Sequence, residues 1–82
     1  MNERLITLYG RPGCELCDRS EALVRALIDA RGSGHTLRLV NIEDDPRLHA
    51  QLLEQIPVLE VAGRRLPLAL GSQQIARHLE LS

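Results

Sequence analysis

The chain has 82 residues, with ten arginines, no lysine, eleven acidic side chains and a formal net charge of −1. This length suits one small domain, since domains usually have roughly 100–150 residues. A charge near zero and a single aromatic residue, Tyr9, argue against nucleic-acid binding, which needs a positive field and stacking platforms. The first apolar stretch, residues 5–8, is too short for a signal peptide or a membrane span. We therefore expect a cytoplasmic protein that contacts no membrane, and the exclusive use of arginine favours a bacterial source.

The first part of the chain predicts a strand followed by a long helix. Residues 5–9 are rich in β-branched and aromatic side chains and stop at the turn formers of residues 10–13, as a buried strand does. A helix of about four turns is expected over residues 15–31, with Glu21 and Arg25 placed for an ion pair and a glycine-rich turn at residues 32–34. Its inward stripe is predicted to consist of Leu16, Leu23, Leu27 and Ala30, with Val24 and Ile28 widening it.

A second strand and a short helix come next. Residues 36–42 are apolar first on alternate positions and then on both faces, which predicts a strand flanked by helices. Asp45 is placed to cap the short helix, and Pro46 occupies its first turn. The inner stripe of this helix is predicted to consist of Leu48, Leu52 and Ile56.

The pattern after the short helix indicates a β-hairpin. Residues 57–61 and 64–68 flank a two-residue Ala-Gly turn and are expected to pair as antiparallel neighbours. Pro67 cannot donate to a sheet ladder, so its strand belongs at the sheet edge. Arg64 and Arg65 are expected to be solvated charges on that edge, where they discourage pairing with another chain.

A last helix opens at Gly71, with Ser72 as its predicted cap and Ile75, Ala76 and Leu79 facing inward. The expected order is β-α-β-α-β-β-α in a single domain over residues 1–82. The first two strands must be parallel with a right-handed crossover, and the hairpin adds antiparallel strands to the same sheet. The sequence therefore predicts an α/β fold with a four-stranded mixed sheet and three helices.

Two cysteines three residues apart, Cys14 and Cys17, stand at the predicted start of the long helix. Structural disulfides are rare in the cytoplasm, so this spacing indicates a redox or metal feature. A helix N-terminus carries unpaired N–H groups and about half a positive charge, which stabilises a thiolate on Cys14. Cys17 lies one turn further on the same face, where it can attack a mixed disulfide formed at Cys14. The pattern predicts Cys14 as the nucleophile and Cys17 as the resolving thiol.

Other uses of the cysteine pair stay open at this point. A zinc site within one chain needs about four ligands, and His35, His49 and His78 stand apart in the sequence, so no metal ligand is assigned. A module that binds a protein partner, or a metal or iron–sulfur cluster shared between two chains, is the alternative from a different class. Two inert buried cysteines are a further alternative.

The dipeptide Ile56-Pro57 lies where the short helix passes into the third strand. Proline lacks a ladder donor and fixes the chain direction there. Only about 5–6% of X-Pro bonds are cis in folded proteins. We nevertheless expect a cis bond here, and its position supports the redox interpretation.

These residues resemble the glutaredoxin branch of the thioredoxin fold. Residues 9–17, YGRPGCELC, are similar to the family opening Y-[ST]-[KR]-x-x-C-x-x-C, and the element order is similar over essentially the whole chain. The resemblance implies that Cys14 and Cys17 are the nucleophilic and resolving thiols. It also implies that Pro57 is the cis-proline beside the active site and that backbone groups of Ile56 hold a substrate peptide or glutathione. Arg11 takes the place of a basic residue that contacts a glutathione carboxylate.

The chain also departs from the family pattern. Glu15 and Leu16 replace the usual Pro-Tyr between the cysteines, and a carboxylate beside the nucleophile disfavours its thiolate. Gly71 and Ser72 stand where the family has Gly-Gly, but the aspartate that follows there and grips the glutathione amino group is absent. The match is closer to small bacterial glutaredoxin-like proteins of unassigned substrate.

We therefore expect a monomeric thiol–disulfide oxidoreductase that cycles between a dithiol and a Cys14–Cys17 disulfide. It needs neither an organic cofactor nor a metal. Its expected partner is a disulfide-containing protein or a glutathione mixed disulfide, and the missing aspartate weakens the case for glutathione as co-substrate. The expected substrate-binding residues are Arg11, Ile56, Pro57, Gly71 and Ser72.

Overall fold

A computed structural model of the chain describes residues 5–32 and 34–80. The elements follow in the order β1 (Leu5–Gly10), α1 (Glu15–Arg31), β2 (Thr36–Asn41), the 3-10 turn η1 (Ile42–Asp44), α2 (Pro46–Leu52), β3 (Val58–Val61), β4 (Arg64–Leu66) and α3 (Ser72–Glu80). This is the predicted order, with η1 added between β2 and α2. The two ends of the predicted 1–82 domain, and Ser33 in the predicted turn after α1, lie outside the described residues.

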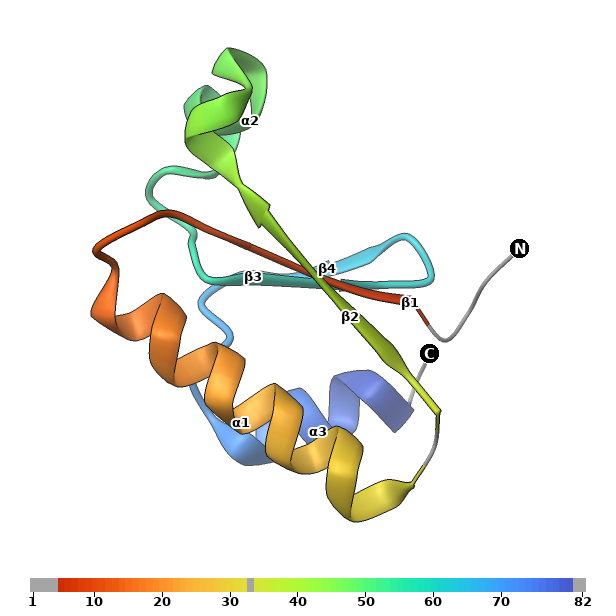
Figure 1. Ribbon diagram of the computed structural model, residues 1–82. Helices are drawn as coiled ribbons and strands as arrows, with labels where there is room; N and C mark the ends of the chain where they lie inside the picture. The colour runs from red at the N-terminus through yellow and green to blue at the C-terminus, as the bar shows by residue number, and fades with distance from the viewer. Residues whose placement is uncertain (1–4, 33, 81–82) are drawn as a thin grey trace.

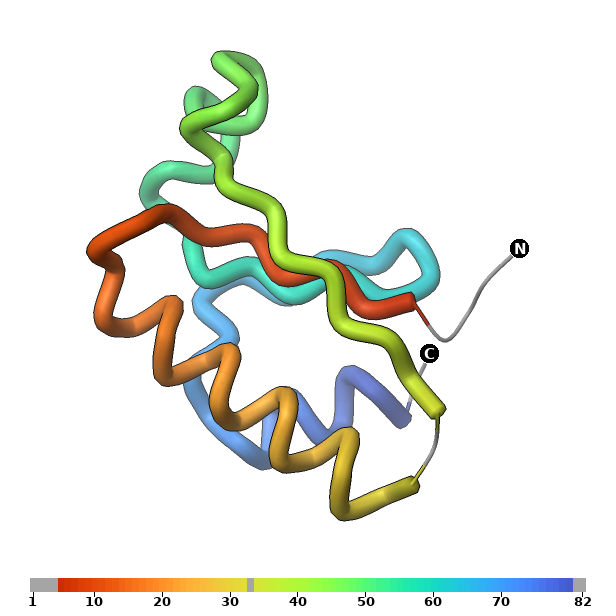
Figure 2. The backbone as a smooth tube through the Cα atoms, viewed as in Figure 1, coloured from red at the N-terminus to blue at the C-terminus, as the bar shows by residue number. Residues whose placement is uncertain are grey.

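The strands form one mixed sheet in the order β2-β1-β3-β4 (Figure 1). β1 is parallel to β2 and antiparallel to β3, and β3 is antiparallel to β4. α1 and α3 lie together on one side of the sheet, and α2 lies beyond the end of β2 (Figures 1 and 2). The predicted α/β fold, the parallel first strand pair and the antiparallel hairpin are confirmed.

Two hydrophobic clusters fill the fold. The aliphatic cluster consists of Ile6, Leu8, Val24, Leu59, Val61, Ala69, Ile75 and Leu79. The cysteine cluster consists of Tyr9, Cys17, Ile42, Leu52, Ile56 and Val58, with Cys14 packed against it. Since successive side chains of a strand point to opposite faces, β1 contributes to both clusters.

Three local signals act where the sequence predicted them, although β4 ends at Leu66 and not at residue 68. Gly32, at φ +58°, ends α1 and donates its N–H to the carbonyls of Ile28 and Asp29 at 3.1 and 3.3 Å. Asp45 caps α2 by accepting the N–H of Arg47 at 2.9 Å, with proline at the first helical position. Between β3 and β4 the two-residue turn has positive φ at both positions, which suits a tight hairpin.

Three packing predictions were wrong. β2 is an edge strand and not one flanked by helices, and its Leu39 is 51% exposed. Along α1, Leu16 is 46% exposed and Ala30 is also exposed, because the buried face of the helix is centred on Cys17, Ser20 and Val24. The prediction was correct for Val24, and Leu23, Leu27 and Ile28 pack against the aliphatic cluster. α3 begins at Ser72, so this residue lies inside the helix and not at the predicted cap position.

Arg65 is more than the solvated edge charge that the sequence suggested. Its Nε donates to Glu60 Oε1 at 2.7 Å, and its guanidinium carbon lies 5.2 Å from the centroid of the Tyr9 ring. The hydrogen bond to Glu60, and then the contact with Tyr9, raise the pKa of Arg65 above its ordinary value. The arginine thus packs on the face of the only aromatic ring in the chain.

Candidate active site

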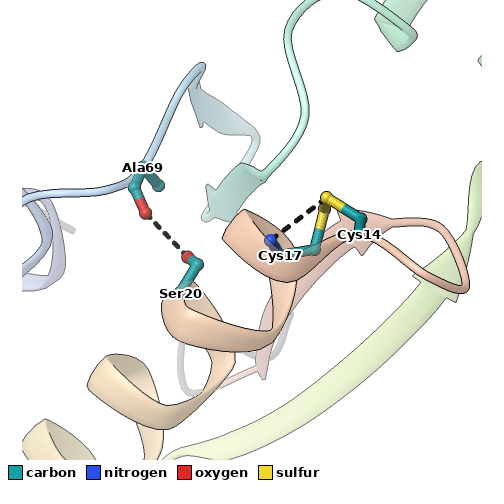
Figure 3. Close-up of a disulfide and its surroundings, with 4 residues drawn as sticks. All are labelled: Cys14, Cys17, Ser20 and Ala69. Atoms are coloured by element: carbon teal, nitrogen blue, oxygen red, sulfur yellow. Dashed lines mark hydrogen bonds between the residues drawn. A yellow bond between two sulfur atoms is a disulfide. The ribbon is translucent and has the colours of Figure 1, made fainter.

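The two cysteines form a disulfide at the N-terminal end of α1 (Figure 3). β1 ends at Gly10, and residues 11–13 turn the chain directly into Cys14, the N-cap of α1. Gly13 has φ +74°, a left-handed conformation that favours glycine. The short turn therefore delivers Cys14 to the helix end that the sequence analysis assigned to it.

Backbone N–H groups of the first helical turn point at Cys14. The Cys17 N–H donates to Cys14 Sγ at 3.1 Å, and the Asp18 N–H donates to the Cys14 carbonyl at 3.1 Å. The sulfur thus occupies the position that an oxygen acceptor usually takes at a helix N-cap. When the disulfide is reduced, this N–H and the positive end of α1 stabilise negative charge on Cys14 Sγ.

The two cysteines differ in burial. Cys17 is only 7% exposed and belongs to the cysteine cluster, whereas Cys14 is partly exposed at its border. The carboxylates of Glu15 and Asp18 lie in the same first turn and oppose the stabilisation of a nearby anion. Cys14 is therefore the more accessible of the two cysteines.

Gly10 allows close packing of β1 against Cys17. A Cβ atom added at Gly10 would lie 3.1 Å from both Cβ and Sγ of Cys17. The sequence alone indicates only a turn former at this position. The signal that identifies it is its position at the last residue of the strand that leads to the cysteines.

A hydrogen-bonded bridge joins α1 to the segments around Pro57. Ser20, which is fully buried, donates its hydroxyl to the Ala69 carbonyl at 2.7 Å (Figure 3). The Ala69 N–H in turn donates to the Pro57 carbonyl at 2.9 Å, and the Leu68 N–H donates to the Gln55 carbonyl at 2.9 Å. Ser20 was not among the residues predicted from the sequence. The spacing of Ser20 from Cys17 and Val24 nevertheless places all three residues on one face of α1.

The structure brings some of the predicted site residues together. Ile56 packs in the same cluster as both cysteines, and the Ile56-Pro57 peptide bond is cis. The Ile56 N–H already donates to the Leu52 carbonyl at 3.0 Å, so that amide is engaged within the chain. Pro57 itself is buried. This part of the predicted constellation adjoins the disulfide.

The other predicted residues lie further out. Arg11 is exposed and lines, with Cys17, Asp18 and others, a cavity of about 150 Å³ between α1 and β2. Gly71 is half-buried, and Ser72 is exposed at the start of α3. The residue of this loop that lines a groove beside Leu16 is Leu70.

Two findings bear on other functions. Among residues 5–32 and 34–80, no group of three or more His, Cys, Asp or Glu side chains is arranged to hold a metal ion. Over the same part of the chain, every helix is too short or too polar to cross a membrane.

The chain is similar to one protein family and to solved structures. A family model described as Glutaredoxin-like domain (DUF836) matches residues 5–80. The X-ray structure of the structural genomics target protein XcR50 from X. campestris is similar, with 27% identity, a TM-score of 0.76 and coverage of 94% of this chain and 97% of that one. Its solution structure gives 29% identity, a TM-score of 0.68 and 94% coverage of each chain. No curated protein matches the sequence.

Proposed function

The chain belongs to the family of the Glutaredoxin-like domain (DUF836), and we propose that it is a thiol–disulfide oxidoreductase. One observation carries the proposal, namely the Cys14–Cys17 disulfide at the N-terminus of α1 with the Cys17 N–H on Cys14 Sγ. That arrangement stabilises a thiolate on the more exposed sulfur and holds a second sulfur within bonding reach.

The reaction proceeds in two exchange steps. In the reduced protein the Cys14 thiolate attacks one sulfur of a substrate disulfide, forms a mixed disulfide and releases the other substrate sulfur as a thiolate. Cys17, after losing its proton to solvent, then attacks Cys14 Sγ and displaces the bound substrate as a second thiolate. The protein loses two electrons and ends as the Cys14–Cys17 disulfide, and an external thiol returns it to the dithiol form.

The partners proposed for this reaction are a disulfide-containing polypeptide and, with less support, a glutathione mixed disulfide. The proposal assigns no organic cofactor and no metal, and it places a monomer in the cytoplasm. Arg11, the Ile56 carbonyl and the loop at Gly71 are the groups proposed to contact the substrate. Support for the substrate side comes from the position of Ile56 beside both cysteines.

The test uses the full chain and two serine variants. The reduced wild type should reduce hydroxyethyl disulfide and lose two hydrogens by intact mass. Cys14→Ser should be inactive, whereas Cys17→Ser should accumulate a mixed disulfide at Cys14 that mass spectrometry detects. An equally active Cys14→Ser variant, or a wild type that forms no reversible disulfide, would overturn the proposal.

The alternative of a cluster shared between two chains predicts a different result. Anaerobic reconstitution with iron and sulfide should then give a coloured dimer whose mass includes the cluster. The Cys14–Cys17 bond within one chain favours the exchange reaction over this use of the sulfurs. A colourless monomer that retains disulfide reductase activity is the expected outcome.

A further inference from the structure

Two exposed leucines line one groove beside the first turns of α1. The large hydrophobic side chains exposed among residues 5–32 and 34–80 are Leu16, Leu39, Leu53, Leu68 and Leu70. Leu16 lies between the cysteines, and Leu39 lines the cavity that Cys17 also lines. Leu68 and Leu70 flank Ala69, which forms hydrogen bonds with Ser20 and Pro57. Leu53 follows Leu52, the α2 residue of the cysteine cluster. Of these leucines, Leu16 and Leu70 lie together in one groove, and a contiguous exposed apolar surface marks a site of interaction.

A groove of about 530 Å³ lies beside α1, and we call it the Leu16 groove. Its walls are Leu16, Ala22 and Leu23 from α1 and Leu70 from the loop before α3, together with Arg19. The Ser20–Ala69 hydrogen bond ties that loop to α1 and so fixes the distance between the two walls (Figure 3). The groove is therefore bounded on both sides by segments that the fold holds in place.

Among the residues that the structure describes, Arg19 is the only charged one that lines the Leu16 groove. Within residues 5–32 and 34–80 its side chain makes no ion pair. An unpaired guanidinium at the border of an apolar groove is complementary to a carboxylate, which it can bind through two parallel hydrogen bonds. The groove thus offers one apolar surface and one positive charge to the same ligand.

We infer that the Leu16 groove binds a polypeptide substrate, with an apolar side chain against its walls and an acidic side chain on Arg19. The inference rests on the proposed function, because it places these two side chains next to the substrate cysteine that bonds to Cys14. Continuity supports it, since Leu16 lies two residues from Cys14 and lines the groove. Glutathione carries carboxylates but no apolar side chain, so it fills only the charged part of this surface.

The experiment measures how fast reduced protein is oxidised by disulfide-linked homodimers of capped pentapeptides. In the probes the cysteine is flanked by leucine together with aspartate, lysine or asparagine, or by glycine together with aspartate. Each rate is divided by the rate of the same probe with dithiothreitol, which removes intrinsic differences in disulfide reactivity. Hydroxyethyl disulfide and glutathione disulfide are measured in the same way.

The leucine–aspartate probe should react about two- to fivefold faster than the leucine–lysine probe at low salt, the range expected for one exposed ion pair. The ratio should fall towards one at high ionic strength. The normalised rate of the leucine–aspartate probe should also exceed the normalised rates of the glycine–aspartate probe and of glutathione disulfide, which lack the apolar side chain.

Substitutions test the charge of Arg19 and the apolar wall at Leu70 separately. Arg19→Glu should invert the preference between the aspartate and lysine probes, and Leu70→Ala should reduce the preference for leucine over glycine. Arg77→Glu is the matched control, since Arg77 is an exposed arginine on α3 outside the groove, and it should leave both preferences unchanged.

Each failure has its own meaning. Equal normalised rates for all peptide probes, or a faster reaction of glutathione disulfide, would overturn the inference while leaving the oxidoreductase proposal in place. A wild type that reduces neither the peptides nor hydroxyethyl disulfide would overturn the proposed function itself.

Discussion

The aliphatic cluster and the cysteine cluster lie in the same small fold but differ in what they contain. The first is purely aliphatic and lies between the sheet and the helices α1 and α3. The second includes Tyr9 and Cys17, and Cys14 packs against it. A reduction potential reflects the difference in stability between the oxidised and reduced forms, so only packing that touches a sulfur is expected to change it. Stability and redox behaviour should therefore respond to different residues.

The strongest expected contrast is between Ile75→Ala in the aliphatic cluster and Ile42→Ala in the cysteine cluster. Both isoleucines are fully buried, and each truncation should cost about 2–5 kcal/mol of unfolding free energy. Urea titration followed by far-UV circular dichroism measures this loss. Equilibration with thiol–disulfide buffers then gives the potential, which Ile42→Ala should shift by about 10 mV or more, or about 0.5 kcal/mol. Equal shifts in the two variants would contradict the separation.

The Ser20–Ala69 bond links the two clusters, because Ala69 belongs to the aliphatic one and Ser20 lies one turn from Cys17. Ser20→Ala leaves the buried Ala69 carbonyl without this donor and should cost about 1–3 kcal/mol of unfolding free energy. It should also slow the reduction of peptide disulfides, because the loop that carries Leu70 loses its tie to α1. Ser72→Ala, on the exposed start of α3, is the control and should change stability by less than about 0.5 kcal/mol. A Ser20 variant as stable as that control would refute the role of the bond.

A smaller effect is expected at the border of the cysteine cluster. Glu15 is exposed and adjacent to Cys14, so Glu15→Gln removes a negative charge that opposes the thiolate. Alkylation of the reduced protein by iodoacetamide at pH 7 should become about two- to fivefold faster, equivalent to roughly 0.4–1 kcal/mol. Asp29→Asn, near the other end of α1, should leave the rate unchanged. A gain that persists in high salt would argue against an electrostatic cause.

The smallest expected effect concerns the exposed pair of Glu21 and Arg25, joined at 2.9 Å on α1. Glu21→Gln should lower the unfolding free energy by only about 0.3–0.5 kcal/mol, as a urea titration would show. Glu21 also lines the cavity that Cys17 lines, so the disulfide reduction rate is measured alongside. It should stay within twofold of the wild type, and a larger fall would assign Glu21 to the redox chemistry.

Much of the site was visible in the sequence because its signals are local. The cysteine spacing, the turn that precedes Cys14 and the helix that follows depend on residues within a few positions of one another. The acidic cap at Asp45 and the Ala62-Gly63 turn were predicted for the same reason. One of the two side chains between the cysteines was assigned to the wrong environment, since helical periodicity alone placed Leu16 inside whereas the structure leaves it 46% exposed.

The sequence by itself determined where β1 begins, where α1 begins and ends, and that two cysteines stand at a helix N-terminus, because backbone preferences and capping act between neighbours. Pro67 predicted that β4 lies at one edge of the sheet, whereas only the tertiary structure decided that β2 lies at the other edge and how Gly10 lets β1 approach Cys17. It also decided that Ser20 reaches Ala69, 49 residues further along the chain. Burial and such contacts depend on the packing of distant segments, and the same packing assembles the Leu16 groove beside the disulfide.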